Sequence, residues 1–206
     1  SRRLELVNYS AAHGSLVIED DFENEFVYLQ KPTPSLFGLA GGQNVVYLGT
    51  FSRLLLPSIR ISFMVLPPEL SALYRKKADQ YNQTASKAEQ IALCQFIRDG
   101  HLAAQTRKLK RLYSVKLKAL RSAVREVFGK DSQIQTGAAG TSLALTLSTT
   151  LTWQELQKKA QTNGLRLQLL REAPGKITLI LSCSSMPVAD FVPACKLLKD
   201  ISQIQN

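Results

Sequence analysis

Three short runs of consecutive or nearly consecutive apolar residues lie in the first third of the chain. They cover residues 16–18, 45–48 and 59–66, and polar residues, glycine or proline bound each of them. Such runs are typical of buried strands in a parallel sheet, whose two faces are both covered. The first run stops at three consecutive acids, residues 19–21. Because α/β proteins place their chemistry at the carboxyl ends of such strands, these acids are candidate site residues.

A helical spacing of apolar residues follows the third run. From residue 69 to about residue 100 they recur at intervals of three and four, which predicts one long or two shorter helices. The same spacing continues over residues 102–128 and predicts a further helix that Gly129 terminates. Residues 4–12 are also expected to be helical. Residues 31–42, which contain two prolines and three glycines, are interpreted as loop.

The last third of the chain alternates between short strands and helices. Thr152, with Glu155 three residues later, has the pattern of a capping box and predicts the start of a helix. The resulting βαββα order is typical of a small α+β subdomain on an antiparallel sheet. The strands are predicted at residues 142–147, 165–170 and 177–182, and the helices at residues 152–162 and 188–201.

Most of the formal net charge of +10 belongs to one predicted helix. Between Arg107 and Lys130 lie nine lysines and arginines against one acid, Glu126. This asymmetry permits direct binding of nucleic acid, but a basic face exposed to solvent is the favoured interpretation. Its apolar residues are already needed for packing, and Tyr113 is the one aromatic residue before Phe128 that could stack on bases.

Composition excludes several other classes of protein. There is no run of 18 apolar residues, so no membrane span is expected. The three cysteines and two histidines lack the spacing of metal ligands, and three reduced thiols in a cytoplasmic protein are the simplest interpretation. The chain starts without methionine or a signal-peptide core, which suggests a processed or cut start.

Three segments in close succession resemble one known family. They are VIEDDFENEF (17–26), VYLGTFSR (46–53) and LLPSIRISF (55–63). Together they are similar to the aminotransferase-like domain of MocR-type, GntR-family transcriptional regulators, in which a winged helix-turn-helix is joined to a pyridoxal-phosphate-binding fold of type I. The resemblance covers most of the chain and implies an α/β fold. Residues 1–100 would then be the remainder of the large cofactor domain with connecting helices. Residues 101–206 would be a small C-terminal α+β subdomain with a basic leading helix.

The resemblance also implies a cofactor site. Asp20 matches the acid that pairs with the pyridine nitrogen, although it could equally cap a turn. Phe22 stands where the family has a tyrosine that hydrogen-bonds the ring oxygen, so that bond is lost. Thr50, Ser52 and Arg60 match the phosphate-binding residues, and hydroxyls with a guanidinium suit a dianion. As alternatives, the hydroxyls could be turn residues and Arg60 a surface charge.

Arg53 stands where the family has the lysine that forms the Schiff base with the cofactor. An arginine stays protonated and cannot condense with an aldehyde, and neither Lys31 nor Lys76 is placed to replace it. We therefore expect no catalytic residue here, and pyridoxal phosphate bound non-covalently or not at all. The family's arginine for a substrate carboxylate is also in doubt, since Arg171 is the last arginine in the chain.

The predicted function is that of an effector-sensing, catalytically inactive domain of a transcriptional regulator. The alternative is a fragment of a pyridoxal-phosphate-dependent aminotransferase. The expected partners are a second copy in a homodimer, a small-molecule effector, and DNA bound through an upstream domain rather than this segment; no membrane partner is expected. The resemblance further implies that an absent first half of the domain supplies a strand between residues 16–18 and 45–48, so this chain should be a fragment or need a companion piece.

Overall fold

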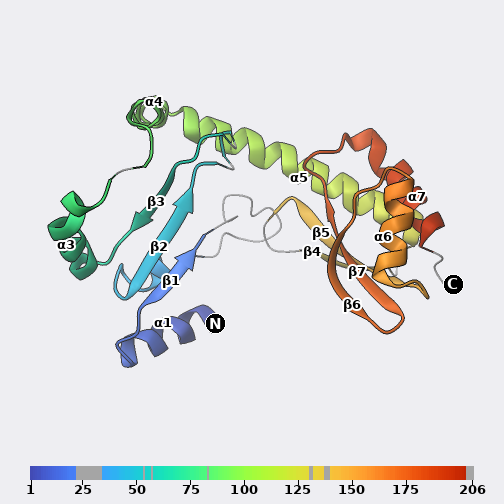
Figure 1. Ribbon diagram of the computed structural model, residues 1–206, viewed down its shortest axis with the longest axis horizontal. Helices are drawn as coiled ribbons and strands as arrows, with labels where there is room; N and C mark the ends of the chain where they lie inside the picture. Colours follow the sequence, from blue (N-terminus) through green and yellow to red (C-terminus); the bar gives the residue numbers. More distant parts are fainter. Residues whose placement is uncertain are drawn as a thin grey trace. The chain divides into compact units, whose positions relative to one another are not determined.

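The computed structural model describes residues 1–21, 34–52, 54–56, 58–82, 84–129, 132–136 and 140–202. The described residues form two compact units, one ending at Leu109 and the other beginning at Lys110 (Figure 1). The division falls within one long helix, α5 (His101–Phe128), which contributes to both units. No helix in these ranges is long and apolar enough to cross a membrane.

The first unit is built on a three-stranded sheet. Its elements before α5 are α1 (Arg2–Ala12), β1 (Val17–Asp20), α2 (Leu36–Leu39), β2 (Val45–Thr50), β3 (Ser62–Val65), α3 (Pro68–Lys77), the 3-10 helix η2 (Ala78–Gln80) and α4 (Lys87–Arg98). The strand order is β1-β2-β3, with β1 parallel and β3 antiparallel to β2. Of the two helical alternatives left open after residue 69, the structure has two helices, α3 and α4.

Direct pairing of β1 with β2 corrects the expected strand order. Val17 lies opposite Val45, and its backbone N–H donates to the carbonyl oxygen of Asn44 at 2.9 Å. Neighbouring strands lie about 4.8 Å apart, which leaves no room for a third strand between them. The prediction of an intervening strand from an absent half was therefore wrong. Among the described residues, no strand lies beside the outer edge of β1 or of β3.

Burial in this sheet is concentrated on the central strand. Val45 and Val46 of β2 are buried and Tyr47 and Leu48 are half-buried, which confirms the expected burial for the first half of the second apolar run. On β1, however, Ile18 is 66% exposed, and all four residues of β3 are exposed. The prediction of buried first and third strands was therefore wrong for this chain. A continuous apolar run indicates a strand whose two faces are both buried. Within the described residues, β2 is the strand with a neighbour on each side.

A short helix also corrects the interpretation of residues 31–42 as loop, of which residues 31–33 lie outside the described residues. Helix α2 begins after Ser35, whose side-chain oxygen accepts a hydrogen bond from the backbone N–H of Gly38 at 3.0 Å. Serine is a favoured N-cap because it satisfies one of the free N–H groups of the first turn.

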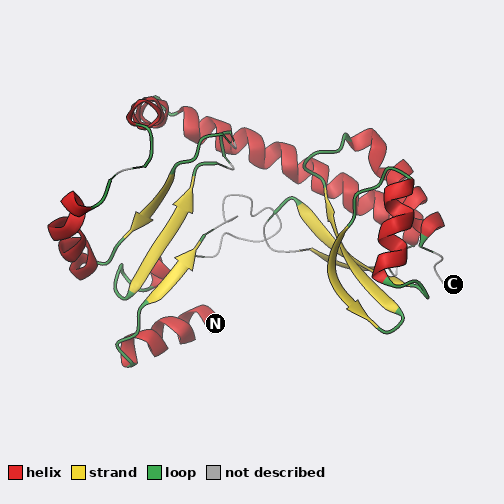
Figure 2. Cartoon of the chain, viewed as in Figure 1, coloured by secondary structure: helices red, strands yellow, loops and turns green. Residues whose placement is uncertain are grey.

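The second unit consists of a four-stranded antiparallel sheet and helices packed on it (Figure 2). Its elements after α5 are β4 (Gln133–Thr136), β5 (Ser142–Ser148), α6 (Trp153–Thr162), β6 (Gln168–Ala173), β7 (Lys176–Ser182), the 3-10 helix η3 (Val188–Asp190) and α7 (Phe191–Ile201). The strand order is β4-β5-β7-β6. Sequence analysis missed β4, whose Gln-Ile-Gln-Thr sequence is too polar for a hydrophobic pattern.

One face of this sheet carries the core of the second unit. Alternate residues of β5 and β7 are buried and pack against α5, α6 and α7, as expected for a sheet with one covered face. The most completely buried members of this core are Val124, Leu143, Leu145, Leu156, Ile177, Leu179 and Phe191. Leu117, Leu120, Val124 and Val127 of α5 are therefore used for packing in this unit, whereas Leu112 and Val115 are exposed. Lys116 donates to the carbonyl oxygen of Ser184 at 3.0 Å.

The cap of α6 was predicted correctly from local sequence, whereas the start of β6 was not. The capping box is confirmed, since the backbone N–H of Thr152 donates to Glu155 Oε2 at 2.8 Å and the Thr152 hydroxyl accepts from the backbone N–H of Glu155. Strand β6 begins at Gln168, three residues later than predicted. The apolar Leu165 and Leu167 before it pack against the core without joining the sheet, which explains the difference.

Candidate functional site

The carboxyl ends of β1 and β2 meet at one edge of the three-stranded sheet. Asp20 lies opposite Leu48 in the register of these parallel strands. Thr50 follows Leu48 by two residues, so it lies on the same face as Asp20, with their Cα atoms roughly 8 Å apart by strand geometry. The Asp20 side chain is exposed. Two of the predicted site residues therefore share one face at one edge of the sheet.

Thr50 and Ser52 tie the end of β2 to the segment that precedes β3. Thr50 Oγ1 lies 3.3 Å from Ser52 Oγ and 3.4 Å from the carbonyl oxygen of Ile61. The Ser52 hydroxyl donates to the carbonyl oxygen of Ile59 at 2.6 Å, and the backbone N–H of Phe51 donates to Ile61 at 3.1 Å. The two predicted hydroxyls thus stand side by side in a tightly closed turn.

Arg60 belongs to the same turn. It lies between the two residues whose carbonyl oxygens face these hydroxyls, and its own side chain is exposed. The remaining two predicted site residues, Phe22 and Arg53, lie outside the described residues. The structure therefore places Asp20, Thr50, Ser52 and the backbone of Arg60 at the carboxyl ends of β1 and β2.

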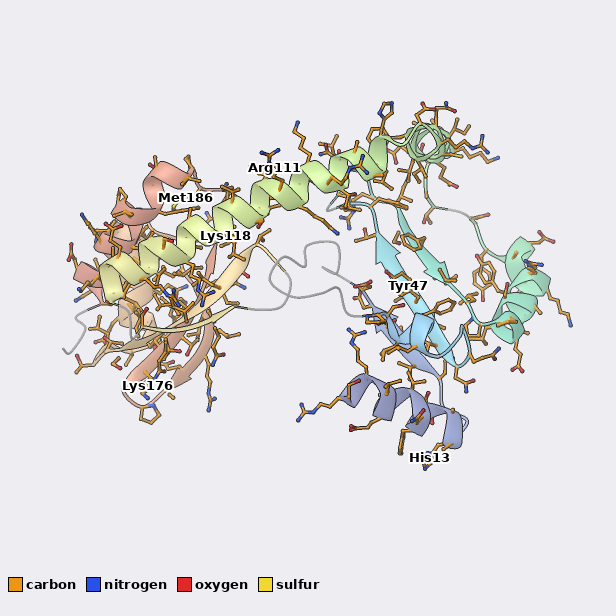
Figure 3. All side chains as sticks on the ribbon, turned by 180° about the vertical axis from the view of Figure 1, so that it is seen from behind. His13, Tyr47, Arg111, Lys118, Lys176 and Met186 are labelled. Atoms are coloured by element: carbon orange, nitrogen blue, oxygen red, sulfur yellow. The ribbon has the colours of Figure 1, made fainter. Side chains whose placement is uncertain are left out.

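Tyr47 and Asp21 form a contact that sequence analysis did not anticipate. The hydroxyl of Tyr47, which is labelled in Figure 3, donates to Asp21 Oδ2. The 2.5 Å contact joins the residue after β1 to β2. Tyr47 lies on the opposite face of β2 from Thr50, because strand residues alternate. There the Phe63 ring, 6.1 Å from that of Tyr47, covers Gly49 so closely that a Cβ atom at Gly49 would clash with the ring. No local sequence signal pairs these residues, since their contact depends on strand register.

Glu19, one of the three acids expected at the site, instead holds neighbouring elements together. Only 8% of its side chain is exposed, and its carboxylate accepts hydrogen bonds from the backbone N–H groups of Leu36 and Phe37 at 2.9 and 3.1 Å. Arg3 of α1 forms an ion pair with it at 3.0 Å. Glu19 therefore fastens α1 and α2 to β1, immediately before Asp20.

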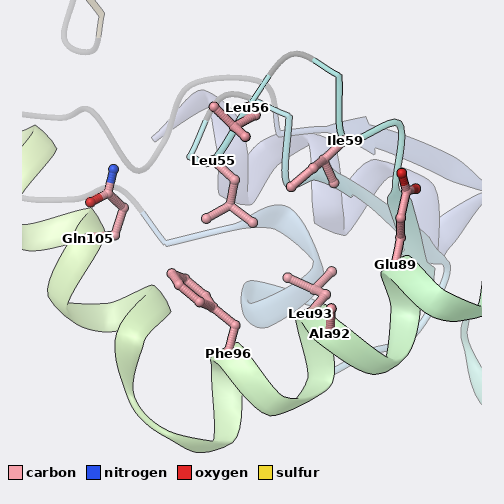
Figure 4. A pocket seen from close by; sticks show the side chains of 8 residues that line it. All are labelled: Leu55, Leu56, Ile59, Glu89, Ala92, Leu93, Phe96 and Gln105. Carbon is pink, nitrogen blue, oxygen red and sulfur yellow. The ribbon is translucent and has the colours of Figure 1, made fainter.

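A mainly apolar cavity of about 370 Å³ lies beside the segment that follows β2 (Figure 4). Leu55, Leu56 and Ile59 line it from the segment after β2, and α4 contributes Leu93 and Phe96. Because the Ile59 carbonyl oxygen accepts the Ser52 hydrogen bond, this cavity and the hydroxyl pair share one structural segment.

The chemistry of this edge suits an anionic small molecule. Two hydroxyls and an arginine can bind a phosphate or carboxylate, and an exposed carboxylate can pair with a protonated ring nitrogen. Within the described ranges, no three histidine, cysteine, aspartate or glutamate side chains come together as metal ligands.

The fold of the chain is that of a fold-type-I aminotransferase, with part of the large domain followed by a small α+β subdomain. Alpha-aminoadipate aminotransferase LysN from Thermus thermophilus, solved with N-(5'-phosphopyridoxyl)-L-leucine, superposes with a TM-score of 0.78. The match covers 97% of this chain and 53% of that one, at 24% identity, so it establishes the fold alone.

Sequence relatives define the class more narrowly. The HTH-type transcriptional regulator YdeL of Bacillus subtilis is 32% identical over 203 residues, which are 97% of this chain and 44% of that protein. The probable rhizopine catabolism regulatory protein MocR of Rhizobium meliloti is 30% identical over 168 residues, 82% of this chain and 34% of that protein. The homologues of this chain are thus MocR-type, GntR-family regulators, and the chain fits their C-terminal aminotransferase-like domain. It spans less than half the length of these relatives. No family model matches the chain.

Proposed function

We infer that this chain is the ligand-sensing part of a transcriptional regulator and does not catalyse transamination. The observation that carries the inference is Arg53, at the position where the resemblance places the cofactor lysine. The regulators among its relatives support it as well. A guanidinium remains protonated at any physiological pH, so it offers no neutral amine to condense with an aldehyde.

The residues at the carboxyl ends of β1 and β2 fit a non-covalently held pyridoxal phosphate. Thr50, Ser52 and Arg60 would hold the phosphate, and Asp20 would pair with the ring nitrogen. When bound, this cofactor supplies an electron-withdrawing ring. To donate to a phosphate, the Thr50 and Ser52 hydroxyls must turn away from the carbonyl oxygens of Ile61 and Ile59. Phe22 lacks the hydroxyl that would add a further hydrogen bond, worth about 0.5–1.5 kcal/mol.

Covalent trapping tests this proposal directly. The full-length natural protein is incubated with pyridoxal phosphate, treated with borohydride and digested, and labelled peptides are identified by mass spectrometry. We expect no adduct within residues 50–60 of the natural protein, and a stable adduct at residue 53 in the Arg53→Lys variant. An adduct mapped to residues 50–60 of the natural protein would contradict the proposal. Labels scattered over surface lysines occur in both proteins and serve as the internal control.

The proposed partners follow from the relatives. YdeL is named as an HTH-type regulator, so we expect DNA to be bound through such a domain in the full-length protein, with a homodimer and a small-molecule effector completing the system. Arg107, Lys108 and Arg111 of α5 are exposed, and we expect the basic residues of this helix to face solvent rather than to form a nucleic-acid site. A salt titration on unrelated duplexes checks this. Tight binding at physiological salt that is lost on changing Lys108, Lys110 and Arg111 to glutamine would assign the contact to this helix instead.

A further inference from the structure

The second unit contains a cavity of its own at one end of its sheet. Strand β6 pairs with β7 only from Gln168, opposite Ile180, whereas β7 continues to Ser182. Residues 164–167 precede β6 and do not join the sheet, so the last residues of β7 lack a β6 partner. A cavity of about 610 Å³ occupies this end of the sheet, within the range of about 300–1,000 Å³ typical of ligand sites.

Apolar side chains form most of the cavity lining. Leu120 of α5, Phe191 and Leu198 of α7, and Leu181 of β7 are among them. Met186, labelled in Figure 3, comes from the connection between β7 and α7 and adds a flexible side chain. The side chains of Phe191 and Leu198 are almost wholly buried, so the cavity borders the core of the unit.

Arg166 is the one charged residue among the described residues that line the cavity. Its side chain is exposed, which places the guanidinium at the rim rather than in the apolar interior. Gln168, Ser182 and Ser185 supply neutral polar groups among the lining residues. The cavity therefore combines an apolar interior, a cation at the rim and neutral hydrogen-bonding groups.

We propose that this cavity binds a small monocarboxylate with an apolar body, such as a medium-chain or aromatic acid. The carboxylate pairs with Arg166, whose planar guanidinium matches its two oxygens, and the apolar body lies against Leu120, Leu181 and Phe191. An amine of the same shape would meet the charge of Arg166, and a sugar would leave its hydroxyls unpaired against apolar side chains. This inference concerns binding to the second unit alone and is independent of the proposed loss of transamination.

Calorimetry on the full-length natural protein tests the proposal with decanoate as the probe and decanol and decylamine as charge controls. Decanoate should bind more tightly than either control. Across hexanoate, octanoate and decanoate, affinity should rise by about four-fold per added methylene until the cavity is filled. The Arg166→Gln variant should lose about five-fold in decanoate affinity, the upper end for a solvent-exposed ion pair. Lys176→Gln, at the other end of β7 and not in the lining, should bind as the natural protein does.

Two filling variants locate the bound acid. Ala194→Phe occupies the cavity from α7 and should abolish binding. Should this variant fail to fold by circular dichroism, Ser185→Trp at the exposed rim serves instead. Absence of decanoate binding to the natural protein at millimolar concentration would overturn the proposal. Decanoate binding to a folded filling variant would also overturn it. So would decanol binding as tightly as decanoate together with unchanged decanoate affinity in Arg166→Gln.

Discussion

Removing the Glu19 carboxylate should release α2 from the sheet. In the Glu19→Ala variant the backbone N–H groups of Leu36 and Phe37 lose their acceptor, and Arg3 loses its ion-pair partner. Glu19→Gln is the intermediate case, because it keeps one acceptor oxygen but replaces the other with a donor. Glu69→Ala, which removes an exposed acid from the first turn of α3, is the matched control.

The expected destabilisation follows from these contacts. Each hydrogen bond to a charged acceptor is worth about 1.5–3 kcal/mol, and the two N–H groups belong to half-buried residues that water can partly reach. The lower end of that range therefore applies, about 3 kcal/mol for the pair. The Arg3 side chain is 43% exposed, so its ion pair adds at most about 1 kcal/mol. Glu19→Gln should lose roughly half as much as Glu19→Ala.

Amide hydrogen exchange in the full-length natural protein measures this effect at the residues concerned. A loss of about 3 kcal/mol corresponds to exchange roughly a hundred-fold faster at the amides of Leu36 and Phe37. Amides of β5, in the other unit, should keep their protection in both Glu19 variants. If the Leu36 and Phe37 amides exchange at the natural rate in Glu19→Ala, Glu19 does not hold α2 and the reasoning fails.

Three further predictions concern other parts of the chain. Gly49→Ala should lower the free energy of unfolding in urea by about 1–3 kcal/mol, because the new Cβ atom meets the Phe63 ring. Adding Phe63→Leu should recover part of this loss, and unchanged stability of the single variant would contradict the prediction. Hydrogen bonds from the Thr152 backbone and hydroxyl hold the pKa of Glu155 below its ordinary value, and Thr152→Ala should raise that pKa toward it, as NMR titration would show. The difference between the folded and unfolded pKa values then shrinks, so acidification through this range should cost the variant less stability than the natural protein. Burial raises the pKa of Cys195 to about 11, so at pH 8 an alkylating reagent should modify the exposed Cys94 first and reach Cys195 only on unfolding, as peptide mapping would show.

Much of the candidate site could be predicted from sequence because its residues lie in short contiguous motifs. Thr50 and Ser52 were expected to act together, and two residues of separation in a turn already places them close. Asp20 was placed at the end of a strand, and the parallel pairing of β1 with β2 brings it to the same edge. The hydrogen-bond partners of the two hydroxyls could not be predicted. They are the carbonyl oxygens of residues 59 and 61, which belong to the segment before β3.

Sequence by itself determined most of the local elements, though not α2 or β4, together with the capping box of α6 and the identity of residue 53. Periodicity, caps and side-chain chemistry act within a few residues, so they can be recognised without the fold. Tertiary structure alone decided that β1 pairs directly with β2. It also decided that Glu19, the first of three consecutive acids, is buried against α2 instead of lying beside Asp20 at the site. The tertiary structure likewise decided at which residue β6 begins to pair with β7, and therefore where the second cavity lies. The physical reason is that strand register and burial depend on segments distant in the chain, and a shift of one residue exchanges the two faces of a strand.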